Sequence, residues 1–320
     1  MNRNISWALV SATCLLCSQN LFAADAEEEA KKAAERAVNK AVASLLAKSV
    51  EQSISDTKKS DQAKSSSGNS VYLQPSYGWM PKFNVAGTEI DSNMTSVLTG
   101  GVFSAGSRAM FGIAANYASL KTTVKTPAMN VLGFVTPAST VKSSTNMSLV
   151  KGTGTAIFSR SSDSNSASAF WATVGGQAGW SSSTADSSSY GVDINLTGSY
   201  TDKKSNFQIL GSYGLANTTS KVDVNVGGQT STTTSNSSAY NFGLQGKYLG
   251  NPVELSLALD YGGVFAEDGA SLTVTPSLDY NINSSSQIGI GYSNSRTVNN
   301  PDNTPSIIFH SIFANYKLSF

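Results

Sequence analysis

The last fifteen residues of the chain, Ser306–Phe320, alternate between two kinds of side chain. Counting back in twos from Phe320 gives a mainly apolar set: Leu318, Tyr316, Ala314, Ile312 and His310. The positions between them hold a mainly polar set: Ser319, Lys317, Asn315, Phe313 and Ser311. Because successive side chains of a β-strand point to opposite faces, this alternation predicts a strand with one apolar and one polar face.

The same alternation recurs in short segments from residue 71 to the end of the chain, and turn residues separate the segments. Twelve predicted strands result: 71–80, 95–104, 109–123, 146–159, 169–181, 190–200, 207–216, 239–249, 253–265, 271–282, 287–295 and 307–320. After the amino terminus no apolar run reaches the roughly 18 residues that a membrane-spanning helix needs. A helical membrane protein is therefore excluded.

The connections between these segments alternate in length. Short connections follow even-numbered segments: 105–108, 201–206, 250–252 and 283–286. Longer and more polar connections follow odd-numbered segments: 81–94, 124–145 and 217–238. The number of strands is even, and the short connections follow even-numbered strands. Both ends of the strand-forming region are therefore expected on the side of the short turns.

The terminal pattern of Tyr316, Leu318 and Phe320 resembles the carboxy-terminal assembly signal of bacterial outer-membrane β-barrels. For the last segment alone, the alternative is an amphipathic edge strand of a soluble sheet. The resemblance implies an all-β fold: a twelve-stranded antiparallel transmembrane β-barrel over residues 71–320, whose last strand closes against the first. It also implies the barrel-assembly machinery, outer-membrane lipid and lipopolysaccharide as partners. In this class the short turns lie in the periplasm and the long loops outside.

Aromatic residues recur at similar distances along the predicted strands. Three segments carry such pairs: Phe170 and Trp180, Tyr190 and Tyr200, and Tyr240 and Tyr248. The first two pairs are ten residues apart, and ten residues on a strand tilted by about 40° rise roughly 25 Å, which matches the apolar band of these barrels. The six aromatic residues are therefore predicted to form membrane girdles.

The first 26 residues read as a secretory signal peptide, with Arg3, an apolar core over 5–16 and small residues around Ala23 and Ala26. Both cysteines lie inside it, so disulfides are not expected in the exported chain. Residues 27–61 are predicted to form a charged, Ala-rich amphipathic helix in the periplasm, and 62–70 a flexible linker. The helix is expected either to associate copies of the chain as a coiled coil or to dock on its own barrel.

The opposite faces of the predicted strands would line the barrel interior. Seven residues are candidate lumen-lining residues: Asp193, Asn195, Lys247, Glu254, Asp260, Asp279 and Lys317. Two interpretations stay open for the charged ones. They form a selectivity ring, or they pair with one another to satisfy charges inside the barrel.

No enzyme is predicted. The single histidine, His310, lies in the lipid-facing register, whereas Ser311 points the other way, so a Ser-His pair does not form. Glu254 and Asp260 are six residues apart on one strand, too far for shared acid–base work. Neither catalytic residues, metal ligands nor a cofactor site are expected, and a net charge of +1 argues against a nucleic-acid partner.

The expected protein is exported through the periplasm to the bacterial outer membrane, where it forms a porin-like passive channel for small solutes. Two alternatives stay open. One is an autotransporter-type barrel that holds the helix of residues 27–61 in its lumen. The other is a structural or adhesive surface protein with a blocked lumen, whose contact surfaces are the segments 124–145 and 217–238.

Overall fold

The computed structural model describes residues 69–85, 88–106, 108–131, 134–182, 186–226, 229–264, 270–298 and 307–320. The predicted signal peptide, the predicted helix of residues 27–61 and most of the predicted linker lie outside these residues. In the described part of the chain, no helix is long and apolar enough to cross a membrane.

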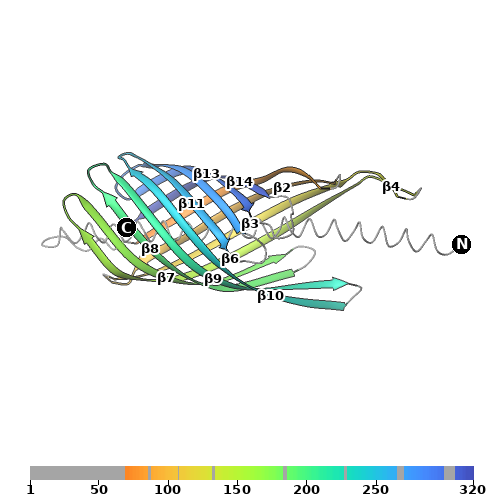
Figure 1. The fold of residues 1–320 in the computed structure, drawn as a ribbon, viewed down its shortest axis with the longest axis horizontal. Coiled ribbons are helices and arrows are strands. Elements are labelled where there is room, and N and C mark those ends of the chain that lie inside the picture. The colour runs from red at the N-terminus through yellow and green to blue at the C-terminus, as the bar shows by residue number, and fades with distance from the viewer. Residues whose placement is uncertain are drawn as a thin grey trace.

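Twelve antiparallel strands close into a single barrel (Figure 1), in the order β1-β14-β13-β12-β11-β10-β9-β8-β7-β6-β3-β2. These strands are β1 (Ser70–Val85), β2 (Thr88–Ser104), β3 (Ala109–Thr126), β6 (Ser139–Ser162), β7 (Ser166–Ser182), β8 (Asp186–Asp202), β9 (Phe207–Val226), β10 (Gln229–Leu249), β11 (Val253–Val264), β12 (Ala270–Asn281), β13 (Ser286–Val298) and β14 (Ile308–Ser319). A small hairpin, β4 (Met129–Val131) and β5 (Phe134–Thr136), lies in the connection between β3 and β6. The predicted twelve-stranded antiparallel barrel is confirmed.

The last strand closes the barrel against the first. β14 pairs antiparallel with β1, from Ser70 opposite Ser319 to Trp79 opposite His310. The backbone N–H of Phe320 continues this closure by donating to the carbonyl of Asn69, at 3.0 Å. The two ends of the barrel-forming region therefore meet at one mouth of the barrel.

The long loops predicted at 81–94 and 217–238 are wrong, because most of these residues continue the strands. The ladder between β9 and β10 runs without a break from Tyr248–Phe207 to Gln229–Val226, and this hairpin projects from the barrel (Figure 1). Residues 227–238 are rich in Gly, Ser and Thr, and 81–94 contains the turn residues Pro81 and Gly87, so neither segment carries a sustained apolar alternation. Side-chain hydrogen bonds hold the projecting part, such as Thr232 Oγ1 to Asp223 Oδ1 at 2.6 Å.

The predicted loop 124–145 is likewise partly strand. β3 continues to Thr126, β6 begins at Ser139, and the β4–β5 hairpin lies between them. Threonine recurs in this segment, and a residue that is β-branched but polar favours extended structure without marking a buried face.

The short turns are closed by local hydrogen bonds. In the turn between β6 and β7, the Asp163 carboxylate accepts the backbone N–H groups of Asn165 and Ser166, at 2.6 and 2.7 Å. These bonds hold the pKa of the Asp163 carboxyl below its ordinary value. In the turn between β8 and β9, Asn206 adopts a φ of 54°, a conformation that asparagine tolerates better than most residues.

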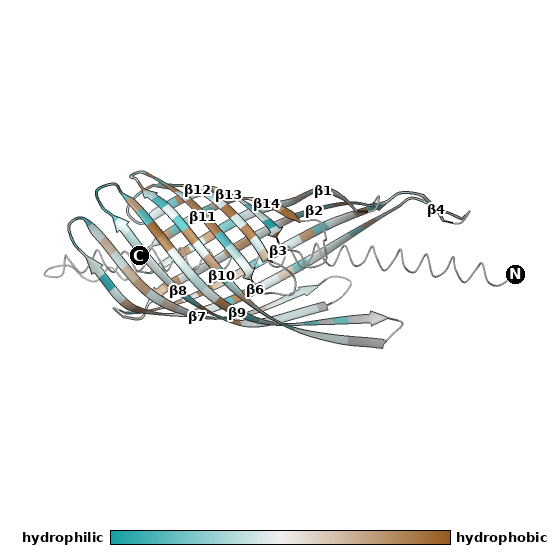
Figure 2. Cartoon of the chain, in the orientation of Figure 1, coloured by the Kyte–Doolittle hydropathy of each residue, from teal (hydrophilic) through white to brown (hydrophobic). Residues whose placement is uncertain are grey.

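Hydrophobic and hydrophilic residues alternate along the barrel strands (Figure 2), and exposure alternates as well, as a barrel with two different faces requires. On β3 every second residue from Met110 to Thr126 is buried, and most of those between them are exposed. The outward face is apolar: on β8, Val192 is 61% exposed and Ile194 is 51% exposed. Large exposed apolar side chains around a closed barrel suit contact with lipid rather than with water. The closed barrel also satisfies every backbone hydrogen-bonding group, as a bilayer requires.

The buried apolar side chains lie on the inward face of one half of the barrel wall, mainly β1, β2, β3, β6 and β7. They form two clusters. The first comprises Tyr72, Leu98, Val102, Met110, Ala114, Leu149, Ile157, Ala169, Trp171 and Leu210. The second comprises Met80, Ile90, Met94, Ala118, Leu120, Val124, Met147 and Phe309. We call the two clusters together the apolar wall.

Candidate functional site

The interior of the barrel opposite the apolar wall is polar, and an ion pair lies where the two meet. Lys151 Nζ on β6 lies 2.7 Å from Asp193 Oδ1 on β8, and the two side chains are only 3% and 10% exposed. Asn195 Nδ2 donates to Asp193 Oδ2 at 2.5 Å. A buried charge needs this kind of partner, because desolvation of a lone charge is costly. The predicted lumen residues Asp193 and Asn195 thus belong to one network with Lys151, which sequence reasoning missed.

Glycines in the intervening strands let these polar side chains lie flat against the wall. Gly175 on β7 separates Lys151 from Asp193, and a Cβ at Gly175 would collide with both side chains. Gly214 on β9 lies beneath the Asn195 amide in the same way. Small residues under polar side chains keep those side chains from projecting into the barrel.

The same arrangement recurs around the polar half. Gly243 on β10 lies between Ser212 and the predicted lumen residue Asp260, and Gly289 on β13 lies between Asp279 and Asn315. The Asn315 amide donates to Asp279 Oδ1 at 3.0 Å across that glycine. The polar half is therefore a layer of side chains hydrogen-bonded across neighbouring strands.

The remaining charged candidates lie near the short turns. Glu254 and Asp279 are direct cross-strand partners on β11 and β12, a juxtaposition that repulsion disfavours unless both carboxylates are satisfied. Asn281 Nδ2 donates to Glu254 Oε1 at 3.0 Å, and Gln287 Nε2 donates to Asn281 Oδ1 at 3.0 Å. Neutral amides thus contribute to holding both carboxylates in place.

The two predicted lumenal lysines occupy the same end of the barrel. Lys247 on β10 is half-buried and pairs in register with Ser256 on β11 and Gln208 on β9. Lys317 on β14 is 9% exposed and pairs in register with Gln287 and Tyr72. The structure brings these charges to one end of the barrel, and their role as a selectivity ring stays a prediction.

The predicted girdle residues lie on the outward face. Five of them are widely exposed: Phe170 41%, Trp180 53%, Tyr190 54%, Tyr200 53% and Tyr248 47%. Tyr240 is half-buried and stacks on Tyr213, with ring centroids 6.1 Å apart. Contact of these rings with membrane interfaces stays a prediction.

The residues of the predicted assembly signal face outward from the closing strand. Tyr316 is 43% exposed and Phe320 is 58% exposed. In the closing ladder, Tyr316 lies opposite Leu73 and Leu318 lies opposite Val71. Recognition of these residues by the assembly machinery stays a prediction.

His310 stacks between two aromatic rings on the outward side of the closing strands. Its ring centroid lies 5.3 Å from Trp79 on β1 and 5.9 Å from Tyr292 on β13. Its Nδ1 atom is hydrogen-bonded to the Tyr292 hydroxyl at 2.5 Å and to Asn294 Nδ2 at 3.1 Å. His310 therefore contributes to the joint between three strands. Within the ranges that the structure describes, no group of three or more His, Cys, Asp or Glu side chains could hold a metal ion.

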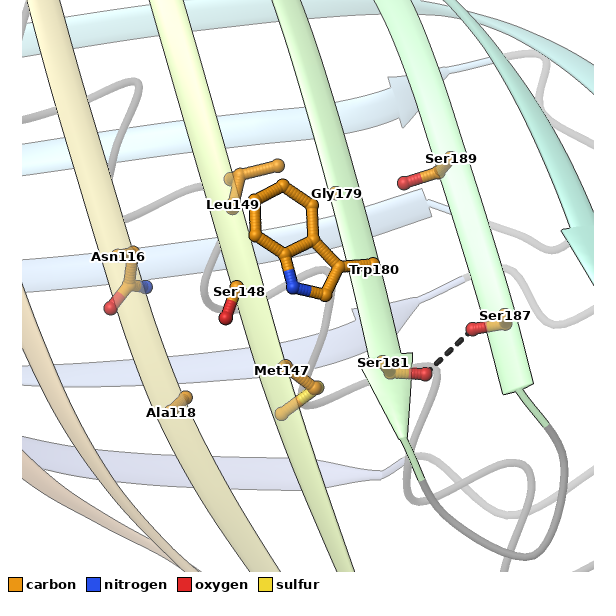
Figure 3. A pocket seen from close by; sticks show the side chains of 10 residues that line it. All are labelled: Asn116, Ala118, Met147, Ser148, Leu149, Gly179, Trp180, Ser181, Ser187 and Ser189. Atoms are coloured by element: carbon orange, nitrogen blue, oxygen red, sulfur yellow. Dashed lines mark hydrogen bonds between the residues drawn. The ribbon is translucent and has the colours of Figure 1, made fainter.

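A pocket lies where the apolar wall meets the polar half, at β3, β6, β7 and β8 (Figure 3). Its lining comprises Asn116, Ala118, Met147, Ser148, Leu149, Gly179, Trp180, Ser181, Ser187 and Ser189. Ser181 and Ser187 are hydrogen-bonded at 2.6 Å, between β7 and β8. The mixed lining offers a small apolar recess with hydroxyl groups at its edge.

No family model and no curated protein matches the chain. Several solved outer-membrane barrels are similar in structure. The translocator domain of autotransporter NalP from Neisseria meningitidis has 12% identity and a TM-score of 0.47, over 84% of this chain and 93% of that one. The transport unit of the autotransporter AIDA-I from Escherichia coli has 11% identity and a TM-score of 0.48, over 82% and 92%. A Pseudomonas aeruginosa FadL homologue has 10% identity and a TM-score of 0.38, over 79% and 90%.

The apolar outer face and the closure of β1 on β14 are features of this chain itself. Together they are what a bilayer demands of spanning strands, and the fold is that of a bacterial outer-membrane β-barrel.

The apolar wall is the main feature that sequence reasoning missed. Predicted strands near the amino end carry apolar residues on both faces, such as Val97 next to Leu98 and Phe111 next to Met110. Only one of each pair can face lipid: Val97 and Phe111 are 44% and 50% exposed, whereas Leu98 and Met110 are buried. Adjacent apolar residues within an otherwise alternating strand were the available signal.

Proposed function

We propose that this chain is exported through the periplasm and forms a passive channel for small solutes in the outer membrane, as porins do. The observation that carries the proposal is the polar half of the interior, where side chains are held flat over glycines such as Gly175 and Gly289. Twelve strands about 4.8 Å apart and tilted by about 40° enclose a backbone diameter of roughly 24 Å. Polar groups held against such a wall leave room for a hydrated path.

Both signs of charge occur inside the proposed channel, which favours weak rather than strong ion selectivity. Lysines at 151, 247 and 317 share the interior with carboxylates at 193, 254, 260 and 279. The closest pair, Lys151 and Asp193, neutralises itself locally. A ring of one sign would be needed for strong discrimination between anions and cations.

A second candidate is an autotransporter-type barrel that holds residues 27–61 in its lumen. The apolar wall favours it. Inward side chains such as Ile90, Leu98 and Val102 are 0–1% exposed, so they are covered rather than in contact with lumenal water. Apolar surface facing a water-filled lumen would forgo about 25 cal/mol per Å² of burial. Asn69 lies at the mouth where β1 and β14 meet, and a linker of nine residues reaches on the order of 17 Å as a random coil.

Conductance of the refolded chain separates the two candidates. We expect single-channel conductance from residues 27–320, and a similar conductance after deletion of 27–64, if the lumen is an open channel. A lumen held shut by residues 27–61 predicts little conductance before the deletion and a clear rise after it. Absence of conductance from both forms contradicts the channel function.

Cross-linking locates the helix directly. Cysteines introduced at Leu45 and at the inward-facing Asn195 report on the two predicted positions of residues 27–61. We propose that these residues associate copies of the barrel, so a disulfide between Leu45→Cys positions of two chains is expected. A disulfide within one chain, between Leu45→Cys and Asn195→Cys, contradicts association and supports the lumenal position.

A further inference from the structure

Three prolines lie inside the described barrel strands. Pro81 lies in β1 beyond its last pair with β14, at the irregularity between Met80 and Phe83 in the β1–β2 ladder. The other two lie in the middle of their strands. Pro75 lies in the middle of β1, Pro276 lies in the middle of β12, and both face outward and are exposed. Proline has no backbone N–H and cannot donate to a ladder. In the middle of a sheet, proline is therefore confined to places where one ladder can be interrupted.

Pro75 and Pro276 each interrupt one ladder. Between β1 and β14, the pairs Leu73–Tyr316 and Ser76–Phe313 keep one register, and the two positions between them are unpaired. Between β12 and β13, the pairs Val274–Asn294 and Ser277–Gly291 likewise enclose two unpaired positions.

On their other sides the two prolines are paired. Pro75 keeps its register partner Val97 on β2, and Pro276 keeps its partner Leu257 on β11. Both prolines therefore turn their N–H-less nitrogen toward the β13–β14 hairpin. The ladder inside that hairpin is unbroken from Ser286–Leu318 to Arg296–Ile308.

The β13–β14 hairpin is thus a continuous unit with an interrupted ladder on each side. The two interruptions lie at nearly the same level of the hairpin. Ala314 faces Pro75, and Tyr292 faces Pro276. The ladder partner of Ala314 is Ile290, only two residues from Tyr292. Inside a bilayer no water replaces a missing ladder bond. This hairpin is therefore held less firmly than the neighbouring strands.

The two seams differ in what bridges them from inside. Across β12 and β13, Thr275 Oγ1 donates to Ser293 Oγ at 3.2 Å, and Asn315 on β14 reaches Asp279 on β12 at 3.0 Å. Across β1 and β14, the Phe309 ring lies over Gly78, where a Cβ would collide with it. Hydrogen bonds bridge the first seam from inside, whereas an apolar contact covers the second from inside and the Trp79–His310 ring stack bridges it from outside, near its far end.

The β1–β14 seam also lies at one edge of the apolar wall. Phe309 on β14 and Met80 on β1 belong to the same buried cluster as Ile90 and Met94 on β2. On the outward side of this seam lie the exposed apolar residues Leu73 and Ile312. An apolar surface therefore continues on both sides of the weakened ladder.

We propose that the wall opens between β1 and β14 at Pro75, and that this opening gives compact apolar molecules a lateral path from the apolar wall of the lumen into the lipid. The β13–β14 hairpin moves as one unit, and the hydrogen-bonded β12–β13 seam serves as its hinge. The inference rests on the proposed channel function, because the apolar molecule must first enter the lumen.

A disulfide across the seam tests the path. In a chain with Cys14 and Cys17 replaced by serine, Ser76→Cys and Phe313→Cys place two cysteines on facing strands, directly beside the unpaired positions. Cells that produce the reduced form are expected to take up the apolar fluorescent probe N-phenyl-1-naphthylamine faster than cells without the barrel. The oxidised form is expected to lose that acceleration and to keep the single-channel conductance of the reduced form in planar bilayers.

The matched control is a disulfide in the unbroken ladder between β11 and β12, at Ser256→Cys and Ser277→Cys, whose hydroxyls lie 2.7 Å apart. It is expected to change neither uptake nor conductance. Equal probe uptake by the oxidised and reduced seam variants overturns the lateral path while the channel function stands. Absence of conductance from every variant overturns the channel function instead.

Restoring the missing donor provides a second test that needs no cross-link. Pro75→Val returns an N–H to β1, and one ladder hydrogen bond is expected to slow amide exchange at residues 313–316 by about tenfold. The same variant is expected to reduce probe uptake without changing conductance. Exchange at 313–316 in the parent chain that is already as slow as at 96–102 in β2 would show that the seam is not weakened.

Discussion

Leu244→Arg is expected to destabilise the barrel by about 2–4 kcal/mol, the usual range for a cation near the bilayer midplane on the lipid-facing side. Leu244 lies on the outward face of β10 and is 52% exposed. An arginine there exchanges apolar contact with lipid for a charge that hydrocarbon does not solvate. The measurement is the free energy of unfolding in urea, from folded barrel in lipid vesicles.

The matched control is the next residue, Gln245→Arg, at the same depth but on the inward, half-buried face. Arginine there faces the polar interior, so we expect a clearly smaller loss. A second outward position, Ile194→Arg on β8, should behave like Leu244→Arg, because Ile194 is 51% exposed. Equal losses at positions 244 and 245 would show that the two faces are not lipid and lumen.

Removal of Phe320 is expected to abolish most assembly into the outer membrane. The residue combines two features: a 58% exposed aromatic ring on the outward face, and a backbone N–H that bonds to Asn69 at the closing seam. Phe320→Asp keeps the backbone bond and replaces the ring with a charge, so it separates the two contributions. The measurement is the amount of heat-modifiable, protease-resistant barrel in the outer-membrane fraction.

Phe320→Leu is the control, since it keeps an apolar side chain at the same position. It is expected to assemble far better than Phe320→Asp. Wild-type amounts of barrel from Phe320→Asp would show that the terminal side chain is not read during assembly, and that closure depends on the ladder between β1 and β14 alone.

The sequence by itself determined the number of barrel strands and the face on which their side chains lie. A period of two is a local property: once Ile194 is assigned to the outside, Val192 and Leu196 must follow. The strand count followed from the turns, because residues such as Asp163 and Asn206 close their connections through contacts within a few positions. These features need no knowledge of distant residues.

The tertiary structure decided whatever depends on which strands are neighbours. Lys151 and Asp193 are 42 positions apart and meet only because Gly175 separates their strands. The projecting β9–β10 hairpin forms because two mainly polar segments pair with each other. Apart from the short alternation of Val222, Val224 and Val226, these segments carry no apolar period that would reveal them as strands. Pairing, unlike alternation, is set by closure of the whole barrel.

The two prolines show this division most clearly. Pro75 and Pro276 are visible in the sequence as residues that cannot donate a hydrogen bond. Which neighbour loses that bond depends on the direction in which each nitrogen points in the closed barrel. Only the ladders of the folded chain place both interruptions beside the β13–β14 hairpin. The physical reason is that a barrel strand has two neighbours. The sequence of one strand does not say which neighbour the N–H at a given position would face.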